Sequence, residues 1–386
     1  MSLTLKLNTK VLSVFALLAV TPVAFADKVP PKIDTLVQES ATRVMRQYNV
    51  PGMVIAISDH GAQRFYNFGV ASKETQTPAT PDTLFEIGSI SKVFTATLAT
   101  YAQAKGHLSL KDPVAEYVPE LKGTPFGQIH LVHLATHTAG GFPLQVPEHI
   151  QNSQQFMDYL KAWKPAYTAG SQRTYANPSI GMLGVIAAKS MGTSYREALE
   201  KHLFAEAGLK NSYLNVPANK AGLYAQGYNK EDAPVRLSAG VLADEAYGVK
   251  TTARDLIHFM ELNMGLGQAS QSIRRAVADT HTGYFQIGPV TQDLIWEQYP
   301  YPTSLKVLLR GNANSMAYES HTATALNPPL PPQKSVWVNK TGSTNGFGGY
   351  VVFIPERQQA VVILANKNYP NDARVTLAHT LIEALD

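Results

Sequence analysis

The sequence contains one Ser-x-x-Lys tetrad, in which Ser89 precedes Lys92 within Phe85-Glu-Ile-Gly-Ser-Ile-Ser-Lys92. The apolar stretch 93–102 that follows predicts a buried helix. A helix that begins at Ser89 would place both side chains on one face, because residues three apart are helical neighbours. An amine beside a hydroxyl favours its use as a nucleophile, and a helix N-terminus favours negative charge. The alternative is a serine-capped helix start with a surface lysine.

A second polar motif, Tyr175-Ala-Asn177, follows a polar turn and precedes Pro178. Proline fits the first turn of the next predicted helix, so the phenol and the amide would lie on a loop that can face a cleft. Tyr-x-Asn also occurs at 213–215 and 369–371, so by itself the motif favours a structural role.

A third motif, Lys340-Thr-Gly342, closes a predicted strand and is followed by Ser343. Glycine at a strand end allows the backbone to approach a ligand closely. The backbone N–H groups of Ser343 and Ser89 would then be able to hold a developing oxyanion. The alternative is a strand end with a polar turn. We discount the similar His281-Thr-Gly283 because it follows a helical segment.

The two ends of the chain predict the elements that position these motifs. Residues 30–48 have helical periodicity, and two strands follow over 51–59 and 64–71. The C-terminal part predicts strands over 335–339, 350–354 and 360–365, and then a helix over 371–385. This pattern indicates one antiparallel sheet built from both termini, flanked by the N- and C-terminal helices, in an α+β fold.

The middle of the chain predicts a mostly helical second lobe, with a ligand cleft between the lobes. Residues 211–249 are rich in Gly, Asn, Pro and Ala and predict a functional loop. Residues 265–332 give no clear assignment, apart from a loop at the prolines 328–332. Helices are predicted over 126–138, 153–163, 177–191, 195–204 and 255–264. The domains expected are an α/β lobe of residues 27–85 and 178–386 and a helical lobe of residues 86–177.

The N-terminus predicts a secretory signal peptide of residues 1–26. Lys6 and Lys10 precede the apolar run 11–20, and Ala24-Phe-Ala26 is a typical cleavage site. About ten apolar residues are too few to span a bilayer core of about 30 Å. With no later apolar span, the mature protein is expected to be soluble in the periplasm and free of the membrane.

Composition narrows the possible functions. Apolar residues make up 45% and charged residues 16% of the chain, which fits a globular protein with a large core. Loss of the two presequence lysines lowers the formal net charge from +4 to +2, so nucleic acid is not an expected partner. The chain has no cysteine, which excludes thiol nucleophiles and disulfides.

Histidines at 130, 133 and 137 invite a metal-site interpretation, because this spacing places them on one helical face. The chain has no His-Glu-x-x-His motif, so we interpret them as ordinary helix residues and expect no metal and no cofactor. The absence of Gly-x-Ser-x-Gly argues against an α/β-hydrolase.

Taken together and in this order, the three motifs resemble those of the serine β-lactamase and penicillin-binding-protein superfamily. The Tyr-x-Asn form, in an exported chain of this length, is similar to the class C β-lactamases, or cephalosporinases. The resemblance covers most of the mature chain and is weakest over 265–332. Further segments that resemble the family are Pro51-Gly-Met53, Pro143-Leu-Gln145, Ala246-Tyr-Gly-Val-Lys250, Phe353-Ile-Pro355 and Leu364-Ala-Asn-Lys-Asn-Tyr-Pro-Asn371.

The resemblance implies that Ser89 attacks the lactam carbonyl and becomes acylated. Lys92 and Tyr175 would handle its proton, and Lys340 would keep the phenol acidic. Whether Tyr175 or Lys92 is the general base stays open. Asn177 and Gln145 would hold the acylamino side chain, and Tyr247 would line the pocket. The residues expected near the substrate carboxylate are Thr341, Ser343, Asn371 and Arg374, the last with an alternative interpretation as a helix-surface residue. Gly342 is also expected to bind substrate, at the strand edge.

We therefore expect a monomeric enzyme that hydrolyses β-lactams, with cephalosporins preferred. One alternative on the same scaffold is an esterase or a D-alanyl-D-alanine peptidase. Another is a penicillin sensor that is acylated without turnover, against which stands the lack of a transmembrane segment.

Overall fold

The computed structural model of the 386-residue chain describes residues 1, 2, 4, 31–238 and 240–385. The predicted signal peptide therefore lies almost entirely outside the described residues. No helix in this described part of the chain has the length and apolar character needed to cross a bilayer.

Nine strands of the described residues form one antiparallel sheet. In chain order they are β1 (Gly52–Asp59), β2 (Ala62–Gly69), β9 (Gly283–Ile287), β10 (Val290–Gln292), β11 (Glu297–Pro300), β13 (Thr324–Leu330), β14 (Val336–Ser343), β15 (Gly348–Ile354) and β16 (Gln359–Ala365). Their order across the sheet is β13-β9-β10-β11-β14-β15-β16-β1-β2. Because β1 pairs with both β2 and β16, the first and last strands of the chain are neighbours, as predicted.

The central strands are buried on both faces. In β1, Met53, Ile55 and Ile57 belong to one apolar core, whereas Val54 and Ala56 belong to the other. Successive side chains of a strand point to opposite faces. A sheet covered on both sides therefore needs the near-continuous apolar run seen in this strand.

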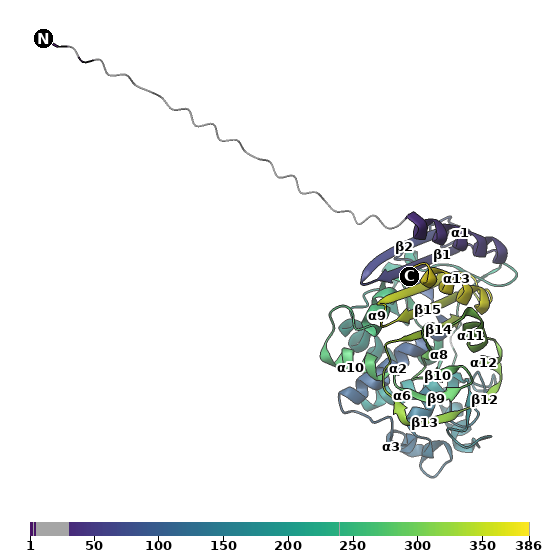
Figure 1. The fold of residues 1–386 in the computed structure, drawn as a ribbon. Helices are drawn as coiled ribbons and strands as arrows, with labels where there is room; N and C mark the ends of the chain where they lie inside the picture. The colour runs from purple at the N-terminus through teal and green to yellow at the C-terminus, as the bar shows by residue number, and fades with distance from the viewer. Residues whose placement is uncertain (3, 5–30, 239, 386) are drawn as a thin grey trace.

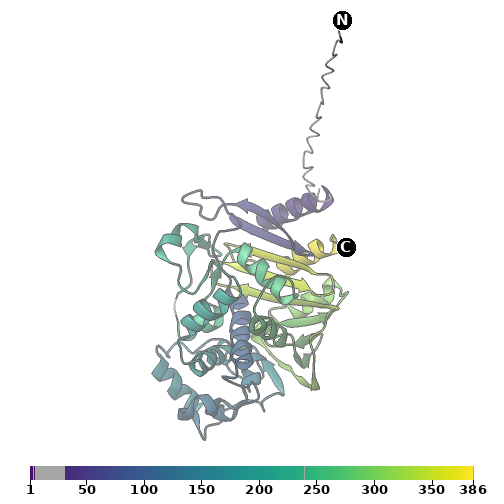
Figure 2. The same ribbon diagram turned by 90° about the vertical axis from the view of Figure 1, so that its left-hand side faces the viewer.

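Helices cover both faces of the sheet (Figure 1). One face carries α1 (Pro31–Tyr48), α11 (Leu305–Gly311) and α13 (Asn371–Glu383), and the other carries α9 (Ala253–Asn263). The remaining helices lie beside the sheet, as Figure 2 shows, and this mixed architecture confirms the predicted α+β class. They include α2 (Ser91–Ala104), α4 (Leu131–Ala135), α5 (Ser153–Ala162), α6 (Asn177–Ser190), α8 (Ala243–Tyr247) and α10 (Gln271–Asp279). The short α12 (Ser315–Tyr318) instead follows α11, and its Met316 belongs to the same apolar core as α11 and α13.

Helix α2 runs through the middle of this helical part and is buried from Ser91 to Ala102. Its threonine hydroxyls donate to carbonyl groups of neighbouring helices or, at Thr97, to the Val93 carbonyl of α2 itself. Thr95 donates to the Glu245 carbonyl at 2.6 Å and Thr100 donates to the Ala276 carbonyl at 2.8 Å. A helix of small and apolar residues can thus be enclosed on all sides without unpaired polar groups.

Two glycines of α6 allow α8 to approach closely. A Cβ atom at Gly181 would lie 2.8 Å from the Leu242 side chain, and one at Gly184 would lie 3.0 Å from the Glu245 side chain. The close approach brings the C-terminal part of α8 against the start of α2, where the Ser-x-x-Lys tetrad is placed.

The single helix predicted over 126–138 is wrong. The structure has a 3₁₀ turn, η3 (Phe126–Gln128), and the short α4. Between them the Ile129 carbonyl accepts from the Val114 N–H, and the Leu131 N–H donates to the Asp112 carbonyl. These tertiary hydrogen bonds replace the helical ones and extend the chain at this point.

Residues 265–332, unassigned from the sequence, supply α10, α11, α12 and four strands of the main sheet. The loop predicted at 328–332 is partly wrong, because β13 continues to Leu330. β13 is an edge strand, where a proline without an N–H group can be accommodated.

One continuous apolar core contains Val54 and Phe353 of the sheet together with Phe94 and Leu183 of the helical part. The division into lobes of residues 27–85 with 178–386 and of residues 86–177 therefore stays a prediction.

Candidate active site

Ser89 lies in a 3₁₀ turn, η1 (Gly88–Ile90), and α2 begins two residues later at Ser91. The α-helix thus begins two residues after Ser89, but the turn continues into it and Ser89 and Lys92 are in contact, as a helix start at Ser89 would require. Gly88 has φ +50°, and a Cβ atom at this position would lie 2.3 Å from the Ser343 carbonyl oxygen. The serine turn thus packs directly on the end of β14, which only glycine permits.

Lys92 is fully buried, so the alternative of a surface lysine is wrong. Its ammonium group donates to the Ser89 hydroxyl at 2.9 Å and to the Ala246 carbonyl of α8 at 2.9 Å. Burial lowers the pKa of Lys92, and the neighbouring charge of Lys340 lowers it further. The geometry therefore places an amine with weakened proton affinity directly on the serine.

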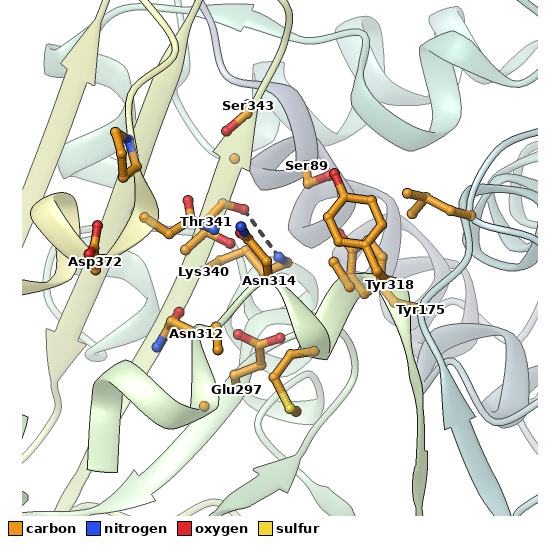
Figure 3. A pocket seen from close by; sticks show the side chains of 18 of the residues that line it. Ser89, Tyr175, Glu297, Asn312, Asn314, Tyr318, Lys340, Thr341, Ser343 and Asp372 are labelled. Atoms are coloured by element: carbon orange, nitrogen blue, oxygen red, sulfur yellow. Dashed lines mark hydrogen bonds between the residues drawn. The ribbon is translucent and has the colours of Figure 1, made fainter. Parts of the chain in front are cut away.

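Tyr175 follows β4 (Gln172–Thr174) and is 7% exposed. Its ring centroid lies 5.1 Å from Lys92 Nζ and 5.2 Å from Lys340 Nζ. Burial raises the pKa of the phenol, but the two ammonium charges and the Ser89 hydroxyl more than offset it, so the pKa is lowered. Figure 3 shows the Tyr175 and Ser89 side chains pointing toward one another.

Lys340 lies on β14 and is 2% exposed, and its ammonium group donates to the Thr341 carbonyl at 3.1 Å. It reaches Tyr175 from the sheet side, whereas Lys92 reaches it from the helical side. Two buried cations around one phenol are costly for folding, and groups held in this way are typical of catalytic sites.

Asn177 and Gln145 lie next to each other in the lining of the cavity. The Asn177 amide donates to the Gln145 amide oxygen at 2.7 Å. The buried Oδ1 of Asn177 has no hydrogen-bond partner among the described residues. An acceptor left open in a cavity is suited to an N–H group of a ligand.

These residues line a cavity of about 670 Å³. Most of the residues predicted from the sequence take part in the lining: Ser89, Gln145, Tyr175, Asn177, Lys340, Thr341, Gly342, Ser343 and Asn371. The structure therefore brings together groups that are up to 282 positions apart, as between Ser89 and Asn371.

Lys92, Tyr247 and Arg374 are not among the lining residues. Lys92 lies directly behind Ser89. Arg374 is completely buried, so the alternative of a helix-surface residue is wrong. Its guanidinium donates to the Ser343 hydroxyl at 2.8 Å and to the Gly342 carbonyl at 2.9 Å. Arg374 therefore supports the end of β14 rather than facing the cavity.

Sequence reasoning missed a buried ion pair below Tyr175. Arg173 donates to Glu297 at 2.9 Å, and its guanidinium carbon lies 5.4 Å from the Tyr175 ring centroid. The charge of Glu297 raises the pKa of Tyr175. Arg173 stands two residues before Tyr175, a spacing that places both on one face of an extended segment. Glu297 lies in the region that gave no assignment.

Sequence reasoning also missed the role of His137, which is buried with its ring centroid 4.3 Å from that of Tyr175. Its Nδ1 accepts from the Ala176 N–H at 3.2 Å. Burial holds the pKa of His137 well below its usual range, and nearby Arg173 and Lys92 add to this effect. A neutral imidazole therefore packs against the phenol.

The helical face predicted for the three histidines is also wrong. His133 lies within α4, His130 precedes it, and His137 follows it with φ +58°. His133 is close to the Thr138 hydroxyl at 2.8 Å, and His130 contacts the Lys111 carbonyl. In the part of the chain that the structure describes, no group of three or more His, Cys, Asp or Glu residues is arranged to hold a metal.

Comparison with known proteins agrees with this geometry. The family model described as Beta-lactamase matches residues 33–386. A beta-lactamase of Lysobacter lactamgenus is 48% identical over 360 residues, which cover 92% of this chain and 94% of the relative.

Solved structures show the same relationship. The beta-lactamase/D-alanine carboxypeptidase of Pseudomonas syringae is 58% identical, with a TM-score of 0.91, and the match covers 92% of this chain and 99% of that one. A class C beta-lactamase in complex with cefoxitin is 50% identical, with a TM-score of 0.89 and coverage of 92% and 99%.

The chain therefore belongs to the beta-lactamase family. Within the family, its similarity to class C structures confirms the resemblance drawn from the three motifs. The activity that goes with this assignment is that of a serine β-lactamase, a hydrolase of β-lactams.

Proposed function

We propose that the protein is an exported enzyme that hydrolyses cephalosporins through an acyl-enzyme on Ser89. The observation that carries the proposal is the Lys92 ammonium, which donates to the Ser89 hydroxyl at 2.9 Å beside a phenol flanked by two cations. A hydroxyl is a weak nucleophile unless a nearby group accepts its proton. Here two candidates for that role, Lys92 and Tyr175, lie next to the serine.

In the acylation step, Ser89 Oγ attacks the lactam carbonyl carbon while its proton passes to Tyr175 or Lys92. Both groups have a lowered pKa, which makes each a suitable proton acceptor near neutral pH. The carbonyl oxygen becomes negatively charged and faces the backbone N–H groups of Ser89 and Ser343. Collapse of this intermediate breaks the C–N bond, and the stored proton is transferred to the lactam nitrogen.

In the deacylation step, a water molecule attacks the ester carbonyl and gives one proton to the same base. The bond between the carbonyl carbon and Ser89 Oγ then breaks. The proton returns to Ser89 Oγ, so the enzyme is regenerated and the product carries a new carboxylate. No further reactant is consumed in either step.

Substrate binding follows from the remaining lining residues. Gln145 and Asn177 would hold the acylamino side chain, with the open Asn177 Oδ1 as an acceptor. The substrate carboxylate would lie near Thr341, Ser343 and Asn371. Arg374 would act on that carboxylate through the Ser343 hydroxyl, to which it donates. The predicted role of Tyr247 as a pocket wall stays a prediction.

The test is turnover of a chromogenic cephalosporin by the purified mature protein. We expect many product molecules per enzyme and a transient covalent adduct on Ser89, detected by mass spectrometry of the quenched reaction. Benzylpenicillin measured in parallel gives the preference, and a higher kcat/KM for the penicillin would contradict the cephalosporin assignment. A single stoichiometric burst without turnover would instead support the sensor alternative.

A second activity, D-alanine carboxypeptidase, is favoured by one observation. The similar protein from Pseudomonas syringae is described as a beta-lactamase/D-alanine carboxypeptidase. The acylation chemistry is the same, except that the leaving group is the amine of a terminal D-alanine. Release of D-alanine from a peptide that ends in D-Ala-D-Ala measures this activity, and its absence would remove the second candidate.

Export to the periplasm and a monomeric state belong to the same proposal. The mature protein from a periplasmic extract is expected to begin at Asp27, which intact-mass measurement checks. Light scattering of the purified protein is expected to give the mass of one chain. A protein found with residues 1–26 attached, or a larger mass, would contradict the respective part.

A further inference from the structure

A buried carboxylate lies three residues before Ser89. Glu86 belongs to β3 (Phe85–Glu86), which pairs with β8 (Lys250–Thr251), and it is 1% exposed. A carboxylate removed from water is costly unless donors surround it. The groups that donate hydrogen bonds to the Glu86 carboxylate are therefore held in fixed positions by it.

The two oxygens of Glu86 accept three hydrogen bonds from two other parts of the chain. Oε1 accepts from the Tyr224 hydroxyl at 2.6 Å and from the Leu237 N–H at 2.8 Å. Oε2 accepts from the Thr344 hydroxyl at 2.7 Å. Tyr224 and Leu237 belong to the long loop, whereas Thr344 follows directly on Ser343 at the end of β14. One carboxylate thus joins the strand before the nucleophile to both of these segments.

The end of β14 and the serine turn are also in direct backbone contact. A Cβ atom at Gly342 would lie 2.0 Å from the Ile87 carbonyl oxygen, and one at Gly88 would lie 2.3 Å from the Ser343 carbonyl oxygen. Between these two segments lie the N–H groups of Ser89 and Ser343, which face the oxyanion in the proposed mechanism. Their separation depends on whatever fixes the two segments relative to each other.

We infer that Glu86 is a positioning residue that sets the separation of the Ser89 and Ser343 N–H groups through its hydrogen bond to Thr344. This inference rests on the proposed acylation of Ser89. The two carboxylate oxygens hold different segments. Oε2 holds Thr344 at the end of β14, next to the oxyanion donors, and Oε1 holds the long loop through Tyr224 and Leu237. Donors aimed at an oxyanion are effective only when they are held before the reaction. The bond to Thr344 supplies that constraint.

Because each Glu86 oxygen accepts a hydrogen bond from a different segment, two matched variants can test the inference. Thr344→Val removes one hydroxyl from the oxyanion side and keeps the shape of the side chain. Tyr224→Phe removes one hydroxyl from the loop side and keeps its ring contact with Phe347, whose centroid lies 6.5 Å away. Each variant costs Glu86 one hydrogen bond of the same chemical type, so they are expected to lose similar stability.

The readout is the affinity for phenylboronic acid, which bonds through boron to a serine oxygen and places a boronate oxygen against oxyanion donors. For Thr344→Val we expect about a tenfold loss of boronate affinity and of kcat/KM, which is smaller than the roughly 10²- to 10³-fold loss when an oxyanion donor is removed, because here the donor is kept and only displaced. For Tyr224→Phe we expect both quantities to stay within about twofold of the wild type. Thr344→Ser restores the hydroxyl and should restore boronate affinity.

Variants at Glu86 itself complete the test. In Glu86→Gln, the amide oxygen can still accept from Tyr224 and Leu237, and the amide nitrogen can donate to the Thr344 oxygen. We therefore expect near wild-type boronate affinity. Glu86→Leu leaves three donors unpaired, so it is assayed on its folded fraction, where affinity should fall at least as far as in Thr344→Val.

Equal losses in Thr344→Val and Tyr224→Phe would overturn the inference, as would an unchanged Thr344→Val. Failure of the proposed function is distinguishable, because the wild-type protein itself would then neither turn over the cephalosporin nor bind the boronate.

Discussion

The two walls of the cavity are built in different ways. The wall around Ser89 is formed by buried polar groups, with Lys340 2% and Tyr175 7% exposed, and is backed by Lys92, which is 0% exposed. A second wall comes from α11, α12 and the turn between them, and its most exposed residue, Tyr318, is 74% exposed. Burial of ammonium groups opposes folding, so the first wall lowers the stability of the protein while it holds its polar groups in fixed positions. The second wall, formed by the described residues 305–318, holds no buried ammonium group, so its side chains can adjust their positions to different substrates.

The electrostatics of the two walls differ in the same sense. Around Tyr175, two ammonium groups lower the pKa of the phenol and one carboxylate, Glu297, raises it. Each charge is buried and therefore weakly screened. At the exposed rim of the second wall, charges would be screened by water. Substitutions should accordingly have large effects on catalysis in the first wall and small, substrate-dependent effects in the second.

The largest effect is expected from the serine and its lysine. Ser89→Ala removes the nucleophile, and Lys92→Ala removes the amine that contacts it, so kcat/KM should fall by about 10⁴-fold or more in each. Stopped-flow assays with the chromogenic cephalosporin measure the loss. Lys105→Ala, at an exposed lysine that follows the same helix, is the matched control and should keep full activity. A covalent adduct in Ser89→Ala would refute the assignment of the nucleophile.

The next effect tests the charges around the phenol. Lys340→Met removes a positive charge that lowers the pKa of both Tyr175 and Lys92. Both pKa values should then rise, because a phenolate loses a stabilising cation and an ammonium loses a repelling one. We expect the rising limb of the pH profile of kcat/KM to move to higher pH by about one unit. At neutral pH, the rate should fall by about a hundredfold, because the oriented cation is lost as well.

The exposed Lys334 supplies the control for this pH shift. Lys334→Met removes the same charge from the same strand region but outside the cavity, so its pH profile should match that of the wild type. A limb that stays in place in Lys340→Met would mean that neither Tyr175 nor Lys92 gives up the proton that the profile reports.

A substitution in the ion pair beneath Tyr175 should shift the pH profile in the opposite direction. Glu297→Gln removes a negative charge that raises the pKa of Tyr175, so the rising limb should move to lower pH. The variant also leaves the Arg173 guanidinium buried without its counter-charge, at a cost of about 3 kcal/mol in the free energy of unfolding. Urea denaturation measures this cost.

A double variant separates the two effects of Glu297. Arg173→Met combined with Glu297→Gln removes both charges, so most of the lost stability should return. If the double variant is less stable than Glu297→Gln by the full cost of a second independent change, the two residues do not act as a pair.

The contrast between the walls also explains what could be predicted from the sequence. Ser89, Lys92, Tyr175 and Lys340 lie in short motifs with local spacing; the structure places three of them in the lining of one cavity and Lys92 directly behind Ser89. Strands at the two ends were recognisable because their apolar runs and turns are local signals. Glu297 could not be found this way, because its pairing with Arg173 spans 124 positions.

Local periodicity failed where tertiary hydrogen bonds replaced helical ones. The segment 126–138 is apolar at helical spacing, yet the chain extends at Ile129 to bond with residues 112–114. In the same way, the second wall of the cavity arises from residues 305–318, whose helices are short and whose apolar pattern is weak. Glu86 carried no signal either, since its role depends on the distant Thr344 and Tyr224.

The smallest effect is expected at the rim of the second wall. Tyr318 is the most exposed of the aromatic side chains along the cavity. The flat, largely exposed ring of Tyr318 is suited to stacking on an aromatic substituent of the substrate, and such stacking contributes about 1 kcal/mol. Tyr318→Ala should therefore raise KM by about threefold to fivefold for a cephalosporin with a large aromatic substituent, and leave kcat almost unchanged. For a small cephalosporin without an aromatic group, both parameters should match the wild type.

Tyr318→Phe keeps the ring and should behave as the wild type with both substrates. An equal loss for large and small substrates would place Tyr318 with the first wall, as part of the catalytic scaffold, and would erase the distinction between the two walls at this residue.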